Sequence, residues 1–225
     1  MVESDLSTRK WRRRKDARPN EIVEAALDAF AEKGFAATRL DDVARRAGVS
    51  KGTLYLYFRD KEALFKAVIQ SALVPNIALA EQRLAGSHGT TAEMFQNVVG
   101  NFLASVVGSK VGVIPKLIIG EAHNFPDIAK FYVEEVVMRG LKIVATILQR
   151  GIDRGEIRPS IDPESAAPVL IGPLLLFVIW KNVLEPHSGR AIDPVGYIQS
   201  YADIVLNGLL IEPAAHEVRP KEGLP

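Results

Sequence analysis

The stretch from Thr38 to Phe65 constrains the fold most, because it contains two short helical patterns separated by a glycine. Apolar residues recur in the first pattern at spacings of three and four, which places them on one helix face: Leu40, Val43, Ala44 and Ala47. Gly48 can take a positive φ and turn the chain, and Ser50 can cap a second short helix. A helix, a tight turn and a short helix with a polar start are the layout of a helix-turn-helix motif.

Helix ends are predicted on both sides of this motif. Thr38 is expected to cap its first helix, and Asp60 to cap a longer helix that follows its second. Before the motif, an apolar stripe predicts a helix from Asn20 to Lys33, with Gly34 as its C-cap. That helix is expected to bury the back of the motif.

The run T-R-L-D-D-V-A-R-R-A-G-V-S-K-G-T-L-Y-L-Y-F-R-D-K-E-A-L-F resembles the DNA-binding signature of the TetR-type transcriptional regulators. The resemblance covers residues 19–70 without a gap. It implies an all-α homodimer, with an N-terminal three-helix DNA-binding domain and a helical C-terminal domain for ligand binding and dimerisation. The chain departs from the pattern at Leu56, where many relatives carry an aromatic or polar residue able to touch DNA.

The second helix of the motif carries the side chains expected to reach DNA. Lys51 and Tyr55 lie four residues apart, on one face, and can contact a base edge or a phosphate. Gly52 allows close approach of the backbone, and Thr53 and Tyr57 offer hydroxyl groups. The resemblance implies that Thr38, before the motif's first helix, and Lys61, after its second, hold the DNA backbone. The predicted DNA-binding set is therefore Thr38, Lys51, Gly52, Thr53, Tyr55, Tyr57 and Lys61.

One alternative reading of the same residues is a hydrolase nucleophile elbow, because the segment from Gly48 to Gly52 fits the pattern G-x-S-x-G. That motif requires a strand before the serine. The residues before Ser50 have a helical pattern, and strands and helices do not alternate along the chain. Ser50 is therefore interpreted as a helix cap, and no catalytic residue is predicted.

Charge is distributed unevenly along the 225 residues. Residues 1–66 contain 15 Lys or Arg against 11 Asp or Glu, whereas the remainder contains 13 against 16. A basic end on a mildly acidic body suits a protein that presents that end to nucleic acid. Residues 1–18 are predicted to form a basic flexible arm. The arm either adds solubility only or follows DNA phosphates and the minor groove.

Composition excludes several other classes of protein. The chain has no cysteine, which rules out disulfides, thiol catalysis and cysteine metal sites. Its histidines lack metal-ligand spacing, so neither a metal nor a cofactor is predicted. The longest apolar run, Pro168 to Trp180, is shorter than the roughly 20 residues that span a bilayer. A cytoplasmic protein without a membrane partner is expected.

The domain division expected from these patterns is an arm over 1–18, the DNA-binding domain over 19–66, a ligand-binding and dimerisation domain over 67–212, and a tail over 213–225. Within the body, the resemblance implies that the apolar helices at about 163–184 and 194–210 pair with their copies in a dimer. Packing of both helices within one chain is the alternative. Candidate ligand-binding residues are Phe95, Phe102, His123, Phe131 and Trp180.

Two classes of function remain at this stage. The first is a dimeric, sequence-specific DNA-binding regulator, released as a repressor from a near-palindromic operator when a small apolar ligand binds. A regulator of the same fold that activates transcription, or has no ligand, is its close alternative. The second class is a helical enzyme, which no recognisable catalytic motif supports.

Overall fold

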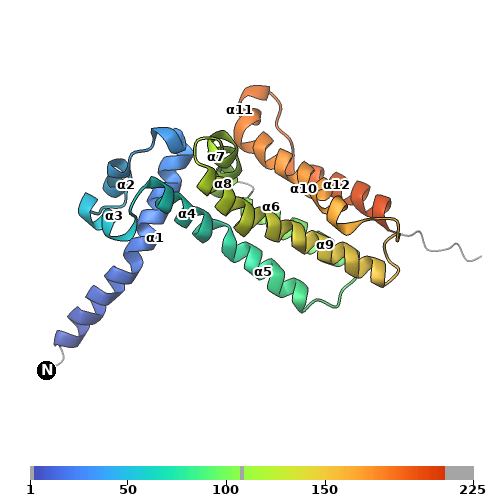
Figure 1. Ribbon diagram of the computed structural model, residues 1–225, viewed down its shortest axis with the longest axis horizontal. Coiled ribbons are helices and arrows are strands. Elements are labelled where there is room, and N and C mark those ends of the chain that lie inside the picture. The colour runs from blue at the N-terminus through green and yellow to red at the C-terminus, as the bar shows by residue number, and fades with distance from the viewer. Residues whose placement is uncertain (1–2, 107–108, 211–225) are drawn as a thin grey trace, which may run out of the picture.

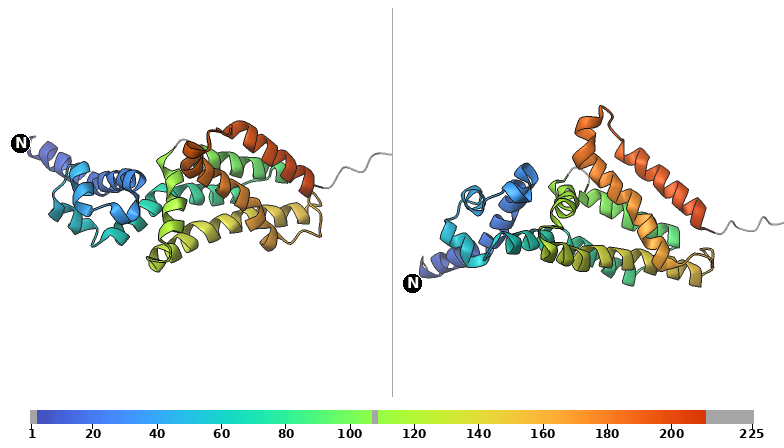
Figure 2. Two further views of the ribbon diagram at one scale, coloured as in Figure 1. Left: turned by 90° about the horizontal axis from the view of Figure 1, so that it is seen from above. Right: turned by 45° about the horizontal axis from the view of Figure 1, so that its top comes forward.

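The computed structural model describes residues 3–106 and 109–210, and side chains from residue 19 onward within them except at 103. A small N-terminal module projects from an elongated body of long helices (Figures 1 and 2). Helices account for the regular structure of these residues, apart from one isolated bridge between Ile157 and Leu210. The predicted all-α class is confirmed. The predicted tail, 213–225, lies outside the described residues.

The N-terminal module is built on three phenylalanines that are fully buried. The ring centroids of Phe30, Phe35 and Phe65 lie 5.0–5.5 Å apart, within the range of favourable aromatic packing. Phe30 and Phe35 lie on α1 (Glu3–Ala37) and Phe65 on α4 (Lys61–Ala72). The module is completed by α2 (Leu40–Arg46) and α3 (Lys51–Tyr57). The cap predicted at Asp60 is present, since its carboxylate accepts a hydrogen bond of 2.7 Å from the backbone N–H of Ala63.

Helix α1 differs from the sequence prediction at its start. It begins at Glu3, so that residues 3–18 continue the helix instead of forming a flexible arm (Figure 1). Lys and Arg are good helix formers, and extending an existing helix avoids the cost of nucleating a new one. At the other end, Gly34 has a φ of 79°, which confirms the break expected there, although α1 resumes as far as Ala37.

The module and the body share one hydrophobic core. Phe125, in the body, packs edge-on against Phe35 at 4.8 Å between centroids. Four buried body residues belong to the same cluster as the module: Ile114, Leu117, Ile118 and Ile128. An ion pair of 2.6 Å between Lys110 and Asp28 adds a polar contact at this junction. The expected division near residue 66 is therefore not a break in packing.

The body begins with helices that continue from α4. A bend at Leu73, two residues before Pro75, separates α4 from α5, because a proline disfavours an unbroken helix. A helical stretch from Pro126 to Asp153 contains a π-helical turn. In order, these elements are α5 (Val74–Ala85), α6 (Thr91–Val106), η1 (Lys110–Val113), α7 (Ile114–Glu121), α8 (Pro126–Tyr132), η2 (Val133–Val137) and α9 (Met138–Asp153).

The C-terminal part packs against α9 through α10. Its elements are α10 (Pro163–Ile179), the π-helical η3 (Trp180–Leu184), α11 (Glu185–Ser188) and α12 (Pro194–Leu209). Asp162 and Asp193 cap α10 and α12 by accepting hydrogen bonds from the backbone N–H groups of Ser165 and Gly196. The hydroxyl groups of Tyr197 and Tyr201 donate hydrogen bonds to backbone carbonyls of α10, which attach α12 to it.

Two helical stretches, Lys61–Ala85 and Pro163–Ser188, are long and apolar enough to cross a membrane by length and composition alone. A bent pair, Thr91–Val106 with Lys110–Glu121, would be a third. The sequence prediction considered only unbroken apolar runs and therefore missed them. Each of the two long stretches has a face buried in protein: Leu64, Phe65, Val68 and Ile69 in the first, and Leu170, Leu174, Phe177 and Val178 in the second.

Candidate nucleic-acid interface

The turn between α2 and α3 is set by Gly48. Its φ of 67° lies in the left-handed region, where a side chain is strained. An added Cβ would meet nothing within 4 Å, so the backbone angle and not space requires glycine. The N–H of Val49 then donates a 3.0 Å hydrogen bond to the carbonyl of Ala44, which closes the turn.

Ser50 begins the second helix of the motif. Its Oγ accepts a 3.0 Å hydrogen bond from the backbone N–H of Thr53 and lies 2.8 Å from the Thr53 hydroxyl. The helix cap predicted for Ser50 is thus confirmed. The element before the turn, α2, is helical, so the strand that a nucleophile elbow needs is missing from this position.

One side of α3 is anchored, and the other faces solvent at the end of the module (Figure 1). Leu54 is fully buried in the module core, with Tyr57 partly buried beside it. The exposed side carries Lys51, Gly52, Tyr55 and Leu56. Leu56 is 83% exposed and Tyr55 is 45% exposed. A helix held in this way can enter a groove without disturbing its own core.

Lys51 is held in place by Asp41 in the first turn of α2. Its Nζ lies 2.9 Å from a carboxylate oxygen of Asp41 and 6.0 Å from the ring centroid of Tyr55. The hydrogen bond with Asp41, together with its negative charge, raises the pKa of Lys51. The side chain is therefore cationic at neutral pH and stays beside Tyr55. The sequence alone does not reveal this pair, because contact between side chains ten residues apart depends on the turn geometry.

Thr38 differs from its predicted role. Its side chain is 2% exposed, and its hydroxyl donates to the carbonyls of Gly34 at 2.6 Å and Ala29 at 3.1 Å. The N-cap of α2 is Arg39, which makes no side-chain cap hydrogen bond. The predicted cap at Thr38 is therefore wrong, and its hydroxyl is engaged in joining α1 to α2 instead of pointing to the surface.

Lys61 also faces the protein. Its Nζ donates to the carbonyls of Phe35, Ala36 and Thr38 at 2.7, 2.9 and 3.1 Å, and lies 4.6 Å from the Phe35 ring centroid. Burial lowers the pKa of this ammonium group, although it remains surrounded by acceptors. The structure thus places Lys61 as a cap on the C-terminal end of α1, where sequence reasoning placed a clamp on DNA.

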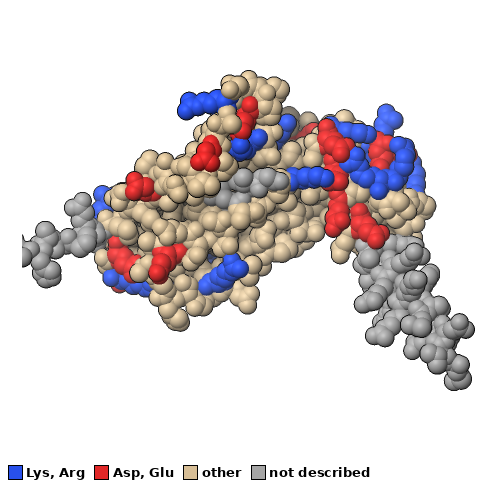
Figure 3. Space-filling model, turned by 180° about the vertical axis from the view of Figure 1, so that it is seen from behind, with Lys and Arg blue, Asp and Glu red and all other residues tan. Residues whose placement is uncertain are grey.

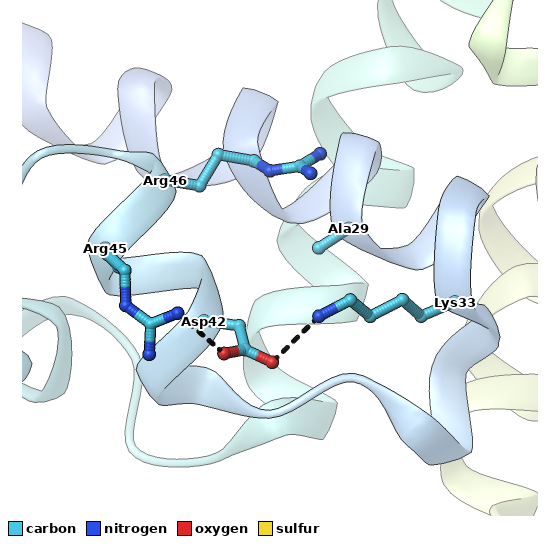
Figure 4. A pocket seen from close by; sticks show the side chains of 5 residues that line it. All are labelled: Ala29, Lys33, Asp42, Arg45 and Arg46. Carbon is cyan, nitrogen blue, oxygen red and sulfur yellow. Dashed lines mark hydrogen bonds and ion pairs between the residues drawn. The ribbon is translucent and has the colours of Figure 1, made fainter.

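Ion pairs fix α2 against α1 (Figure 4). Lys33 lies 3.0 Å from Asp42, and this contact lowers the pKa of the Asp42 carboxyl. Arg46 donates to both carboxylate oxygens of Glu32, at 2.7 and 2.5 Å. With Ala29 and Arg45, three of these residues line a surface pocket of about 260 Å³: Lys33, Asp42 and Arg46. Lys33 and Arg46 in this pocket form ion pairs with Asp42 and Glu32, and these ion pairs hold α2 against α1.

Lys and Arg gather over the end of the molecule that carries the module, whereas the body shows mostly uncharged residues (Figure 3). Four acidic side chains of α1 and α2 lie among the basic ones and form ion pairs with them: Asp28, Glu32, Asp41 and Asp42. Residues 19–66 contain eight Lys or Arg and eight Asp or Glu, so the basic excess predicted for the N-terminal region comes from residues 1–18, whose side chains lie outside the described ones.

The five candidate ligand-binding residues are not brought together. Phe95 is buried between α6 and the C-terminal helices, whereas Phe131 packs against the module core. Phe102 and His123 are exposed. The five residues therefore do not line one common space here, because equivalent apolar positions on successive helices face different clusters, and their ligand-binding role stays a prediction.

Trp180 is the candidate with a feature that favours ligand binding. Its indole N–H is buried and has no hydrogen-bond partner within the described residues. It opens the π-helical turn η3, a type of distortion that is frequent at functional sites. A second π-helical turn, η2, interrupts the helix that leads into α9. Neither turn has a local sequence signature that could have been recognised.

The chain was compared with known proteins. The family model of the tetR family of bacterial regulatory proteins matches residues 22–68, and that of the tetracyclin repressor-like C-terminal domain matches residues 87–189. The HTH-type transcriptional regulator YhgD of Bacillus subtilis is 30% identical over 193 residues, which are 84% of this chain and 94% of YhgD.

The chain belongs to the TetR family.

Solved TetR-family structures agree with this assignment. A transcriptional regulator from Mesorhizobium loti superposes with a TM-score of 0.70 at 26% identity, covering 88% of this chain and 99% of that one. The ketosteroid transcriptional regulator KstR2 of Mycobacterium tuberculosis gives 0.66 at 25% identity, covering 87% and 96%. The TetR-family chain described here is therefore a transcriptional regulator and not an enzyme.

Proposed function

We propose that this protein is a dimeric, sequence-specific repressor that leaves a near-palindromic operator when a small apolar ligand binds in its body. The observation that carries the DNA-binding part is the exposed face of α3, which bears Lys51, Gly52 and Tyr55 on a helix anchored by the buried Leu54. A cation and a hydroxyl on one face match the acceptor groups of phosphates and base edges.

The roles within the predicted DNA-binding set are assigned by exposure. Lys51 and Tyr55 contact base edges or phosphates, and Gly52 allows the helix to approach closely. Thr53 and Tyr57, both partly buried, are placed to reach phosphates at the sides of the helix. Thr38 and Lys61 act on DNA binding indirectly, by holding α1 and α2 in register.

The N-terminal end of α1 contributes to DNA affinity without reading sequence. Positions 9–18 contain seven Lys or Arg and only one acidic residue. A helix of this composition that projects from the module suits the phosphate backbone.

Dimerisation is supported by apolar side chains left exposed on α10 and α12. Val169 and Leu176 are 70% and 58% exposed on α10, and Val195 and Ile204 are 61% and 71% exposed on α12. Exposed apolar residues grouped on neighbouring helices mark an interaction surface. A two-fold pairing of these helices would bury them and set the spacing of the two copies of α3.

A small apolar ligand is supported by the composition of the body and by a relative. The helices α6 to α10 are rich in aliphatic residues, and Trp180 offers a buried, unpartnered donor among them. KstR2, which is called a ketosteroid regulator, has the same fold. Ligand binding at the π-helical turns would change their packing and favour a dimer that no longer fits the operator. We expect this repressor to act in the cytoplasm.

Selection from a random double-stranded DNA library tests the DNA-binding part. The wild type is expected to enrich a near-palindromic motif, whereas the double variant Lys51→Ala, Tyr55→Ala enriches none and keeps its helicity and its oligomeric state. Lys116→Ala, on the exposed surface of α7, is the matched control and should enrich the wild-type motif.

Failure of the folded wild type to enrich any motif at moderate salt would refute sequence-specific binding. Titration of the preformed complex with apolar compounds, steroids among them, then distinguishes an inducible repressor from a regulator without a ligand. Release of DNA at a saturable concentration supports the inducible repressor, and in vitro transcription from the bound promoter decides between repression and activation.

A further inference from the structure

We propose that Leu56 is a specificity residue that packs against the C5-methyl group of a thymine in the major groove. The inference rests on the proposed function and adds to it the identity of one base in each half-site. Leu56 departs from the resemblance described above, and it does not contribute to the hydrophobic core.

Leu56 is the most exposed of the large apolar side chains in the described part of the chain, at 83%. It belongs to neither the module core nor the residues packed against it. The helix that carries it, α3, lies toward the opposite end of the molecule from α12 (Figure 1), so the proposed dimer would not cover Leu56. Exposure of a leucine is unfavourable in water, and a partner that covers it would gain binding energy.

Gly52 supplies a second observation on the same face. Gly52 and Leu56 are one helical turn apart, and side chains on a helix lean toward its N-terminus, so Leu56 lies over Gly52. A Cβ at Gly52 would meet only the Ser50 Oγ, at 3.8 Å, which is an ordinary contact. Neither φ nor packing within the protein therefore requires glycine there. A DNA surface that approaches closely from outside would account for it.

The major groove presents one apolar group, the thymine methyl, among polar donors and acceptors. A leucine can neither donate nor accept a hydrogen bond. Opposite the edge of a guanine, cytosine or adenine it would displace water and leave polar groups unsatisfied. Opposite a thymine it buries its own surface together with the methyl group. Leu56 would therefore favour thymine by attraction and disfavour the other bases by desolvation.

The neighbouring side chains fit this assignment. Lys51 and Tyr55 project from the exposed side of α3 as well, and both carry polar groups. They can satisfy acceptors on the bases or phosphates next to the thymine, while Gly52 brings the helix close enough for a leucine to touch the floor of the groove. The exposed face thus divides into a polar edge and an apolar edge.

The test uses the motif recovered by library selection. Each thymine is replaced in turn by deoxyuridine, which lacks only the C5-methyl group. For wild-type protein, we expect one position in each half-site at which the replacement weakens binding about fourfold, the effect of one buried methyl group. Leu56→Ala should bind the thymine and deoxyuridine operators with equal affinity at that position.

Leu79→Ala, which removes an exposed leucine of α5, is the matched control and should keep the wild-type preference for thymine. The inference is overturned if no single thymine is sensitive to loss of its methyl group, or if Leu56→Ala retains the same sensitivity as the wild type. If the folded wild type enriches no motif at all, the proposed function fails, and the inference fails with it for that separate reason.

Discussion

Lys61 closes the C-terminal end of α1 with one ammonium group that serves three carbonyl oxygens. Helix ends carry carbonyls without partners inside the helix, and a buried carbonyl without a partner destabilises the fold. Thr38 performs a similar task a few residues away, with its hydroxyl shared between two carbonyls of α1. These residues determine where α2, and with it α3, begins.

We predict that Lys61→Met destabilises the protein by about 1.5–3 kcal/mol, because hydrogen bonds from a charged group are lost and the carbonyls become unsatisfied. Urea unfolding followed by circular dichroism measures the effect. Lys116→Met, at an exposed position on α7, is the control and should change stability little. Unchanged stability together with weaker DNA binding would instead assign Lys61 to the DNA interface.

At this scale the sequence revealed which face of α3 is exposed, but not where every polar group points. The i to i+4 spacing of Lys51 and Tyr55 was sufficient, because helix geometry alone places them together. The carbonyls that Thr38 and Lys61 bind could not be read from the sequence. Ala29 lies nine residues from Thr38 and Phe35 lies 26 residues from Lys61, and the tertiary fold brings each pair together. For the same reason the sequence did not show that Phe95 and Phe131 belong to different clusters, because an apolar residue does not reveal which cluster it joins.

At the level of elements, an ion pair between Arg139 and Glu81 contributes to the contact of α9 with α5. The Nε and Nη2 atoms of Arg139 donate to the two carboxylate oxygens of Glu81, at 2.9 and 2.7 Å. This bidentate geometry is the strongest form of such a pair. The hydrogen bonds from Arg139 lower the pKa of Glu81 below its ordinary value of 4.5. The packing of the two helices is therefore linked to pH.

We predict the sign of this linkage. A carboxyl whose folded-state pKa is lowered stabilises the protein above its unfolded-state pKa, and the contribution is lost as pH falls through the folded-state value. Glu81→Gln should thus lower stability at pH 7 by less than about 1 kcal/mol, since the pair is partly exposed, and by less at about pH 3 than at pH 7. Urea unfolding at both values measures this. Glu24→Gln, exposed on α1, serves as control, and equal losses at the two pH values would contradict the linkage.

Helix limits were predicted well where a side chain caps the helix. Ser50, Asp60, Asp162 and Asp193 all accept the backbone hydrogen bonds that their types suggested. The start of α1 was missed because charge density was taken as disorder, although Lys and Arg have high helix propensity. The π-helical turns were missed because an i to i+5 hydrogen bond depends on packing around the helix.

For the whole molecule, the exposed apolar residues of α10 and α12 predict the oligomeric state. We expect Ile204→Asp, at a 71% exposed position, to leave the protomer folded and to shift the dimer toward monomer by burying a charge in the proposed interface. Analytical ultracentrifugation measures the shift, and affinity for a two-half-site operator should fall in parallel.

Ile119→Asp, at a 61% exposed position on α7, introduces the same charge outside that interface. It should leave the association constant unchanged. Equal effects of the two substitutions, or none from Ile204→Asp, would place the interface elsewhere.

The core shared by the DNA-binding module and the body limits how such a regulator can be recombined. The aromatic cluster of α1 and α4 continues into α7 and α8 through Phe125 and four aliphatic residues. In a chimera joined after α4, the core of the DNA-binding module would be exposed on the side that α7 and α8 cover here. The new body would have to supply apolar side chains of matching shape. DNA specificity is therefore exchanged between such proteins more simply by substitutions on α3 than by transfer of the whole N-terminal module.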